Sequence, residues 1–351
     1  MLKKNHNIAL FMQDSLGSDN GKMGYGIMRY STNPIACIID STQAGQTVRQ
    51  ACGLPFDVPV VANIAQAQGL GANVIVTGTA PSGGRIPKSW LPALHEALGA
   101  GMSLVNGLHD SLNELLDAQL SESQFIWDIR KPQFTPQIAS GLAASQKNLR
   151  ILMIGTDMAI GKMTAGLELY RWSQGQSLSS AFVATGQVGI SITGSGIPLD
   201  SFKVDHACGA VEAAVMQVAD KDLVFIEGQG SLLHPGSSAT LALMRGSCAN
   251  RFILCHRAGM TSIETADGKR RVEVPPLDEF IQLNEQLASV CGSLSSAKTV
   301  GIALNTHHLS DSDARKEIAK LENELSLPVQ DLVRYGAEKL GTALLASTNK
   351  F

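Results

Sequence analysis

The chain has 351 residues, 44% of them hydrophobic and 17% charged, with a net charge of −3 at pH 7. This composition supports a sizeable buried core and excludes a disordered chain. The small negative charge gives no reason to expect nucleic acid or an anionic membrane as a partner, and no apolar run approaches the ~20 residues of a membrane span. The length favours two domains.

The cysteines and the N-terminal residues indicate the cellular compartment in which the protein is expected. The six cysteines are dispersed, and no two form a CxxC pair. Most lie in apolar surroundings, so we expect free thiols in a reducing cytosol rather than a disulfide or zinc framework. The basic N-terminus precedes an apolar run too short for a signal peptide, with no small-residue cleavage site after it. A cytoplasmic protein is therefore expected.

The first third of the chain alternates short apolar runs, rich in Val and Ile, with loops and helical patterns, which is typical of a parallel α/β sheet. Residues 88–101 place their large apolar side chains on one helical face and end on glycine. No GxGxxG follows any of these strands, so a redox role with NAD is excluded. The expected strands are 34–40, 58–63, 73–78 and 102–108.

The pattern lapses between residues 128 and 150, where two prolines and many small or polar residues indicate an interdomain connection. A second α/β series follows. Its expected strands are 149–154, 179–184, 222–227, 251–255 and 298–304, and its expected helices are 162–174, 206–219, 277–290 and 312–324. The sequence thus predicts two parallel-sheet α/β domains: an N-terminal Rossmann-like domain (1–130), a linker (131–148) and a C-terminal P-loop NTPase-like domain (149–351).

A glycine-rich loop follows the first strand of the second domain, running from Gly155, Thr156 and Asp157 to Gly161 and Lys162. Consecutive backbone N–H groups, the positive end of the following helix and the lysine charge together form an anion site. Five residues separate its glycines, against four in the usual P-loop. Dethiobiotin synthetases and their nucleotide-binding relatives resemble it in loop length and in the opening Gly-Thr-Asp. We therefore predict phosphate binding.

The residue after the lysine is Met163, where nucleotide hydrolases carry the hydroxyl that holds Mg²⁺. Mg²⁺ requires oxygen ligands at about 2.1 Å, which a thioether cannot supply. Thr164 lies about 100° further around the helix and would not point into the same site. The loop is predicted to bind phosphates without an essential metal, which suits a ligand that reacts elsewhere, such as coenzyme A.

Three further loops follow expected strands. Gly186 and Gln187 begin a loop with four glycines in eleven residues, which is typical of close approach to a ligand. Glu227 ends an apolar strand at the sheet edge where open α/β folds bind ligands. Glu227 is suited to binding Mg²⁺, orienting water or acting as a general base. The alternative is that it only caps local backbone groups and takes no part in chemistry. Asn305 follows the strand 298–304, where P-loop relatives recognise a base.

These motifs together resemble a known family. GTDMAIGKMT (155–164), TGQVGI (185–190) and EGQGSLLHP (227–235), with the N-terminal GTAPSGGRIPKSW and GMSLVNGLHDSL, are similar to a bacterial family first catalogued as a domain of unknown function and associated with DgcN-type D-glutamate N-acetyltransferases. The resemblance covers nearly the whole chain, and Met163 is the usual residue of that family. It implies acetyl transfer from acetyl-CoA, as co-substrate, to the amine of D-glutamate in D-amino-acid catabolism.

Such a reaction needs a proton acceptor, because the substrate amine is mostly ammonium at neutral pH. The candidates are Glu227 and His234, with Asp205 and His206 behind them. Backbone N–H groups of the glycine loops are suited to stabilising the charge that develops on the thioester oxygen.

A dicarboxylate substrate also needs cations or clustered N–H groups. An arginine matches a carboxylate with two parallel hydrogen bonds, although a solvated surface arginine is an equal alternative for Arg85. Arg257 is suited either to the substrate or to a phosphate of CoA. The candidate substrate-binding residues are Ser82, Gly83, Gly84, Arg85, Lys88 and Arg257.

Two other functions remain open. An ATP- and Mg²⁺-dependent kinase or ligase of the dethiobiotin-synthetase type would use Lys162 for the phosphates and Glu227 with Thr164 for the metal, but Met163 argues against it. A non-catalytic nucleotide or CoA sensor would bind without turnover. Many small-molecule enzymes are homo-oligomers, and the sequence is compatible with one.

Overall fold

The computed structural model describes residues 2–3, 5–265 and 268–347. Its contacts divide the chain into two compact units. The first contains the residues up to 133 together with 187–201, and the second contains 134–186 and the residues from 202 onward. The domain limits drawn from chain order stay predictions; by contacts, the segment 187–201 lies with the first unit.

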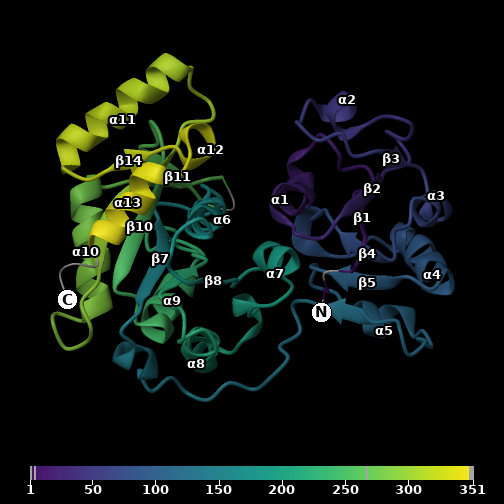
Figure 1. Ribbon diagram of the computed structural model, residues 1–351, viewed down its shortest axis with the longest axis horizontal. Helices are drawn as coiled ribbons and strands as arrows, with labels where there is room; N and C mark the ends of the chain where they lie inside the picture. Colours follow the sequence, from purple (N-terminus) through teal and green to yellow (C-terminus); the bar gives the residue numbers. More distant parts are fainter. Residues whose placement is uncertain (1, 4, 266–267, 348–351) are drawn as a thin grey trace. The chain divides into compact units, whose positions relative to one another are not determined.

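The first unit contains a six-stranded parallel sheet in the order β3-β2-β1-β4-β5-β6 (Figure 1). This is the doubly wound order of Rossmann folds, which reverses direction between β1 and β4. Every residue of β1, β4 and β5 is buried, as expected of strands covered on both faces. The strands are β1 (Ile8–Phe11), β2 (Ile35–Ile39), β3 (Val60–Val61), β4 (Val74–Thr77), β5 (Ser103–Asn106) and β6 (Ile126–Asp128).

Six α-helices accompany this sheet among the described residues: α1 (Lys22–Tyr30), α2 (Val48–Cys52), α3 (Ile64–Gly69), α4 (Leu91–Gly99), α5 (Leu112–Leu116) and α7 (Gln187–Thr193). Side chains fix where three of them begin, because Thr47, Asn63 and Ser111 each accept the backbone N–H three residues further on. Helix α7 comes from the second half of the chain and packs against α1. Arg130 ties this segment to the unit by binding the Asp200 carboxylate and the Gly107 carbonyl.

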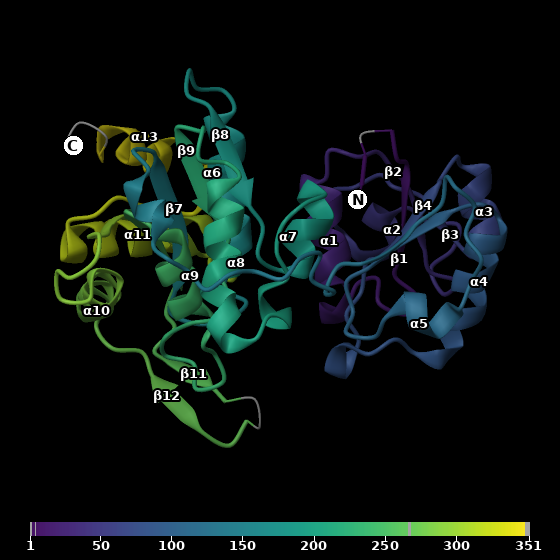
Figure 2. The same cartoon turned by 90° about the horizontal axis from the view of Figure 1, so that it is seen from below.

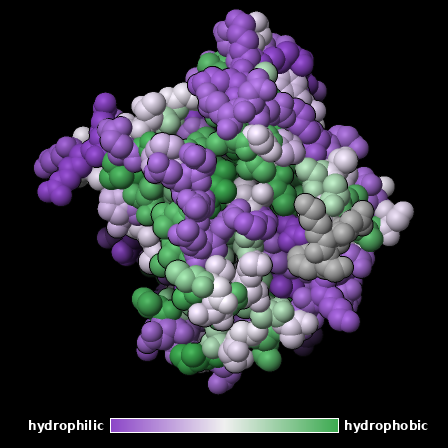
Figure 3. Space-filling view, turned by 90° about the vertical axis from the view of Figure 1, so that its left-hand side faces the viewer, coloured by the Kyte–Doolittle hydropathy of each residue, from purple (hydrophilic) through white to green (hydrophobic). Residues whose placement is uncertain are grey.

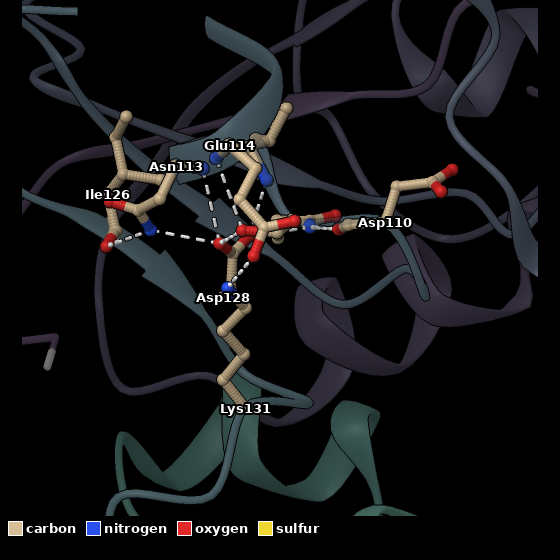
Figure 4. Close-up of polar contacts among 9 residues, drawn as sticks. Asp110, Asn113, Glu114, Ile126, Asp128 and Lys131 are labelled. Carbon is tan, nitrogen blue, oxygen red and sulfur yellow. Dashed lines mark hydrogen bonds and ion pairs between the residues drawn. The ribbon is translucent and has the colours of Figure 1, made fainter. Parts of the chain in front are cut away.

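A buried carboxylate joins the last strand of this sheet to α5 (Figure 4). Asp128 is 5% exposed and accepts hydrogen bonds from Asn106, Ser111, Leu112 and, twice, Asn113. These donors outweigh the cost of burial, so the pKa of Asp128 lies below its ordinary value. The carboxylate therefore stabilises the helix start and the end of β6 together.

The second unit contains another six-stranded parallel sheet, in the order β14-β13-β10-β7-β9-β8. Strand β7 lies near its centre and is buried along its whole length. The strands are β7 (Leu149–Gly155), β8 (Ser180–Val183), β9 (Leu223–Ile226), β10 (Arg251–Arg257), β13 (Lys298–Asn305) and β14 (Val329–Gln330). An antiparallel hairpin of β11 (Ser262–Glu264) and β12 (Arg271–Glu273) extends away from the unit (Figure 2).

Helices lie along this second sheet: α6 (Lys162–Ser173), α8 (Val204–Met216), α9 (Ala239–Ser247), α10 (Leu277–Ser289), α11 (Asp311–Leu325), α12 (Leu332–Tyr335) and α13 (Glu338–Ala346). The segment before β7 is fixed on α8, because Glu212 accepts the backbone N–H groups of Ser140 and Leu142. A side chain at Gly209 would overlap the Gln137 carbonyl oxygen, so this close approach requires glycine. Much of the predicted linker thus packs against the second unit.

The sequence predictions of fold class and of two parallel sheets are confirmed. All nine predicted strands are present within a few residues, and so are the predicted helices. The short strands β1, β6 and β14, the hairpin and helices α1, α2, α3, α5, α7, α9, α12 and α13 were not predicted individually. No helix among the described residues is long and apolar enough to cross a membrane. Figure 3 shows one face of the second unit, where hydrophilic residues surround exposed apolar ones.

We predict that Asp128→Asn lowers the free energy of unfolding of the first unit by about 1–3 kcal/mol, because an amide cannot accept all five hydrogen bonds. The pKa of Asp128 is depressed in the folded state, so this stabilisation is present above its unfolded pKa of about 3.9 and is lost as the pH falls through the lower folded pKa. Chemical denaturation at several pH values measures both effects.

The matched control is Asp57→Asn, which removes an exposed ion pair with Arg49 in the same unit. It should leave the unfolding midpoint nearly unchanged. Equal losses in the two variants would contradict the role given to Asp128.

Candidate functional site

Five loops of the second unit follow the carboxyl ends of parallel strands and therefore meet at one edge of its sheet. They follow β7, β8, β9, β10 and β13. In open parallel sheets this edge is where ligands bind. The sequence candidates of the second unit lie mostly in these loops.

The loop between β7 and α6 is an uncapped helix start. Gly161 is the N-cap residue of α6 and has a φ of 113°, a conformation that favours glycine, and no side chain caps the helix there. Ala159 also has a positive φ, of 54°. The first N–H groups of α6 have no acceptor within the helix, so they and the positive end of the helix are available to an anion.

Lys162 lies in this loop with its side chain buried, only 6% exposed. Its stem runs between two glycines: a Cβ atom at Gly155 would lie 3.1 Å, and one at Gly228 3.0 Å, from Lys162 Cδ. Its Nζ atom donates to the carbonyl oxygen of Asp157 at 2.6 Å. Burial lowers the pKa of Lys162, while Asp157 and Glu227 act in the opposite direction. The absence of side chains at Gly155 and Gly228 therefore leaves the space that the stem of Lys162 occupies.

Glu227 follows β9, the strand next to β7, which precedes the phosphate loop, and is 2% exposed. Its Oε2 atom accepts the backbone N–H groups of Thr185 at 2.8 Å and Gly186 at 3.0 Å, and its Oε1 atom accepts Gln229 Nε2 at 3.2 Å. Burial raises its pKa to about 7, although these hydrogen bonds and the charge of Lys162 oppose the rise. A carboxyl group that exchanges a proton near neutral pH thus lies beside the anion loop.

Glycines bring the loops after β8 and β9 together. A Cβ atom at Gly186 would clash with Gln229 Nε2, and one at Gly230, where φ is 67°, would overlap Ser237 Oγ. Thr185 closes the contact by donating its hydroxyl to the Glu227 carbonyl oxygen at 2.9 Å. Gly186, noted in the sequence, is thus needed for packing beside Glu227.

The remaining catalytic candidates differ in their surroundings. His234 is 6% exposed, and its Nδ1 atom accepts the backbone N–H of Gly236 at 3.1 Å, so the neutral ring carries its proton on Nε2. His206 is half-buried, and its Nδ1–H group donates to the Pro136 carbonyl oxygen at 2.8 Å. Asp205 is exposed in the first turn of α8, where an acid complements the helix dipole. His206 thus has a structural partner, Asp205 lies at a helix start, and the catalytic roles of both stay predictions.

One residue of the site was missed in the sequence. His256 is 6% exposed near the end of β10, and its Nδ1 atom lies 2.9 Å from the hydroxyl of the fully buried Thr156. Burial lowers the pKa of His256 to about 4, so the ring is neutral at physiological pH. The hydroxyl of Thr156 therefore fixes the start of the phosphate loop to the neighbouring strand. The two residues are 100 positions apart in the chain, so the contact can be recognised only once β7 is known to pair with β10.

A cavity of about 490 Å³ opens on the β13 side of the phosphate loop, whereas Glu227 follows β9, on the opposite side of β7. Thr164 lines it, whereas Met163 is half-buried in the first turn of α6. Asn305 also lines it and donates to the Ile160 carbonyl oxygen at 3.3 Å. The lining residues are Ile160, Gly161, Thr164, Ala165, Ala303, Leu304, Asn305, His307, Asp331, Leu332, Val333 and Arg334.

Of the cationic candidates, Arg257 lies in this second unit, exposed at the end of β10 and paired in register with Asn305. Arg85 belongs to the first unit, where its guanidinium is 75% exposed and binds Asp110 at 2.7 Å. Lys88 is exposed nearby. The other ligand-binding candidates of the first unit are the turn Ser82–Gly84 and Gln187, the first residue of α7.

Among the described residues, no three His, Cys, Asp or Glu side chains gather as a metal-binding group. Thr164, whose hydroxyl would have to replace the missing P-loop ligand, lines the cavity. Glu227 is held by three N–H donors. These residues fit an anion better than they fit Mg²⁺, which needs several free oxygen ligands.

Comparison with known proteins agrees with this geometry. Residues 41–132 match the family model described as DUF1611_N, a Rossmann-like domain of unknown function, and residues 137–341 match the DUF1611_C P-loop domain of unknown function. Together they confirm the resemblance seen in the sequence.

Two curated relatives share the name D-glutamate N-acetyltransferase. The protein from Tritonibacter scottomollicae is 35% identical over 306 residues, covering 86% of this chain and 90% of the relative. The protein from Pseudoalteromonas sp. is 33% identical over 282 residues, covering 79% and 83%. The crystal structure of a DUF1611 family protein from Anabaena variabilis has a TM-score of 0.91 at 43% identity, covering 97% of this chain and all of that one.

We predict that Gly228→Ala destabilises the second unit by about 3 kcal/mol or more, because the added methyl group would overlap the Met153 carbonyl oxygen and press on the stem of Lys162. Chemical denaturation measures the loss. The control is Gly175→Ala in the same unit, where the new Cβ atom would lie 3.6 Å from the nearest atom, an ordinary contact. Similar midpoints for the two variants would contradict the close approach at Gly228.

Proposed function

This chain belongs to the DUF1611 family, and from that premise we propose that it is an N-acetyltransferase that moves the acetyl group of acetyl-CoA to the amine of D-glutamate. The names of the two curated relatives support an acyltransferase and suggest the acceptor. The observation that carries the proposal is the buried Glu227, with a pKa of about 7, beside an anion-binding loop.

The reaction needs a base, because an amino acid's amine is mostly ammonium at pH 7. Glu227 in its ionised form takes one ammonium proton, and the free amine then attacks the thioester carbon. A C–N bond forms, the C–S bond breaks, and CoA leaves as a thiolate that takes up the second proton lost by the amine nitrogen; Glu227 then releases the first proton to solvent. A base with a pKa near the working pH is suited to this transfer.

Lys162 and the start of α6 would hold the diphosphate of the donor. In the structure Nζ of Lys162 donates to a neutral carbonyl oxygen of its own loop. A phosphate oxygen is the stronger partner, because both groups are then charged. Backbone N–H groups of the glycine loops would stabilise the negative charge that forms on the thioester oxygen.

An ATP-dependent kinase or ligase on a carboxylate is the second candidate, because Glu227 also occupies a strand end beside the phosphate loop, where an acid can hold Mg²⁺. Two residues argue against it: Met163 occupies the position of the metal-binding hydroxyl, and Thr164 lines the cavity. The two candidates differ in their donor and in metal dependence.

We expect purified protein to release CoA from acetyl-CoA when D-glutamate is present, and to do so in excess EDTA. A thiol-reactive dye measures the release, and mass spectrometry identifies N-acetyl-D-glutamate. Parallel reactions contain L-glutamate, or ATP and Mg²⁺ in place of acetyl-CoA. No thiol from acetyl-CoA, together with Mg²⁺-dependent ADP formation, would replace the proposal with the kinase or ligase.

The activity should rise with pH through about 7 and then level off, since Glu227 acts only when ionised and burial has raised its pKa to about 7. Glu227→Gln should lower kcat/KM by about 10²–10⁴-fold and remove this rise. The profile is measured from pH 5.5 to 9. Exposed Glu279, on α10, gives the matched control Glu279→Gln, whose profile should equal that of the wild type. An unchanged profile in Glu227→Gln would exclude Glu227 as the base.

A further inference from the structure

The cavity beside the phosphate loop has the size and lining of a small-molecule site. Its volume of about 490 Å³ lies within the range of known ligand pockets. Much of its wall is apolar, from Ala165 on α6, Leu304 on β13 and Leu332 on α12. Gly161, the N-cap residue of α6, forms part of the same wall. A ligand in the cavity would therefore reach the anion site directly.

The order of the sheet separates this cavity from the reactive carboxyl group. Strand β7, which carries the phosphate loop, has β10, β13 and β14 on one side and β9 on the other. The cavity is lined from the side of β13 and β14, whereas Glu227 follows β9. A ligand whose phosphates occupy the loop can therefore extend in two opposite directions, one into the cavity and one toward Glu227.

The polar side chains of the cavity are already committed to the fold. Both oxygens of Asp331 are engaged: one accepts Thr306 through its N–H and its hydroxyl, and the other accepts the N–H groups of Val333 and Arg334. Asn305 donates to a carbonyl oxygen of the loop and accepts from His307. These groups shape a binding pocket and are poorly placed to move protons. The cavity thus suits the end of a ligand that does not react.

We propose that this cavity binds the adenine ring of the acyl donor, so that the diphosphate lies on the phosphate loop and the acetyl thioester extends toward Glu227. The inference rests on the proposed function, and it adds the direction in which the donor lies. A planar heterocycle fits between apolar walls, and acetyl-CoA carries its adenosine and its thioester on opposite sides of the diphosphate. Arg334 is the one Arg or Lys among the described lining residues. Its Nη2 atom donates to the carbonyl oxygens of Thr306 and Leu309, which fixes the guanidinium at the cavity, where its positive charge would face the 3′-phosphate of the ribose.

The test compares acetyl-CoA with S-acetyl-4′-phosphopantetheine, which lacks the adenosine portion. Val333 lines the cavity and is 51% exposed, so Val333→Trp can fill the pocket with little disturbance of the core. The wild type should prefer acetyl-CoA in kcat/KM by at least tenfold, and the variant should lose most of this preference. Adenosine 3′,5′-bisphosphate should compete with acetyl-CoA in the wild type, with an inhibition constant raised at least tenfold in the variant.

Leu241→Trp is the control, because Leu241 is 40% exposed on α9 and does not line the cavity. It should retain the donor preference of the wild type. Equal use of the two donors by the wild type, or an equal loss with both donors in Val333→Trp, would overturn the inference while leaving acetyl transfer intact. Turnover of neither donor by the wild type would remove the proposed function and this inference with it.

Discussion

The candidate site depends on the burial of one positive charge, the ammonium group of Lys162. Moving such a charge out of water costs several kcal/mol unless partners replace the lost solvent. Here a loop carbonyl oxygen and the nearby Glu227 are the partners, and Gly155 and Gly228 leave room for the stem. Neither partner neutralises the lysine fully, because the carbonyl is uncharged and the carboxyl group titrates near neutral pH. An anionic ligand of the kind proposed would therefore supply the missing negative charge.

Two buried carboxyl groups in this chain show how burial and hydrogen bonds act in opposite directions on a pKa. Asp128 and Glu227 are similarly buried, at 5% and 2% exposure. Asp128 accepts five hydrogen bonds, and its pKa falls below the ordinary value. Glu227 accepts three, and its pKa rises to about 7. Burial acts to raise the pKa of both groups; the five donors reverse this effect at Asp128, whereas the stronger desolvation of Glu227 outweighs its three donors.

The sequence allowed prediction of features that depend on local pattern. The two sheets followed from runs of branched residues, and Lys162 and Glu227 from their positions after apolar strands. Features that depend on tertiary pairing could not be found in this way. The contact of His256 with Thr156 arises from strand register, and the cavity arises from three elements distant in sequence. Strand β6 has only three residues, too few to give a pattern of its own.

The discontinuity of the first unit affects how it is made. Its last helix, α7, begins at residue 187, after β7, α6 and β8 of the second unit have already been encoded. During translation, more than fifty residues of the second unit are therefore synthesised between residue 133 and α7, the helix that packs against α1. A fragment that ends at residue 133 would lack α7 and also the carboxylate that binds Arg130. The first half of the gene therefore does not encode a complete first unit.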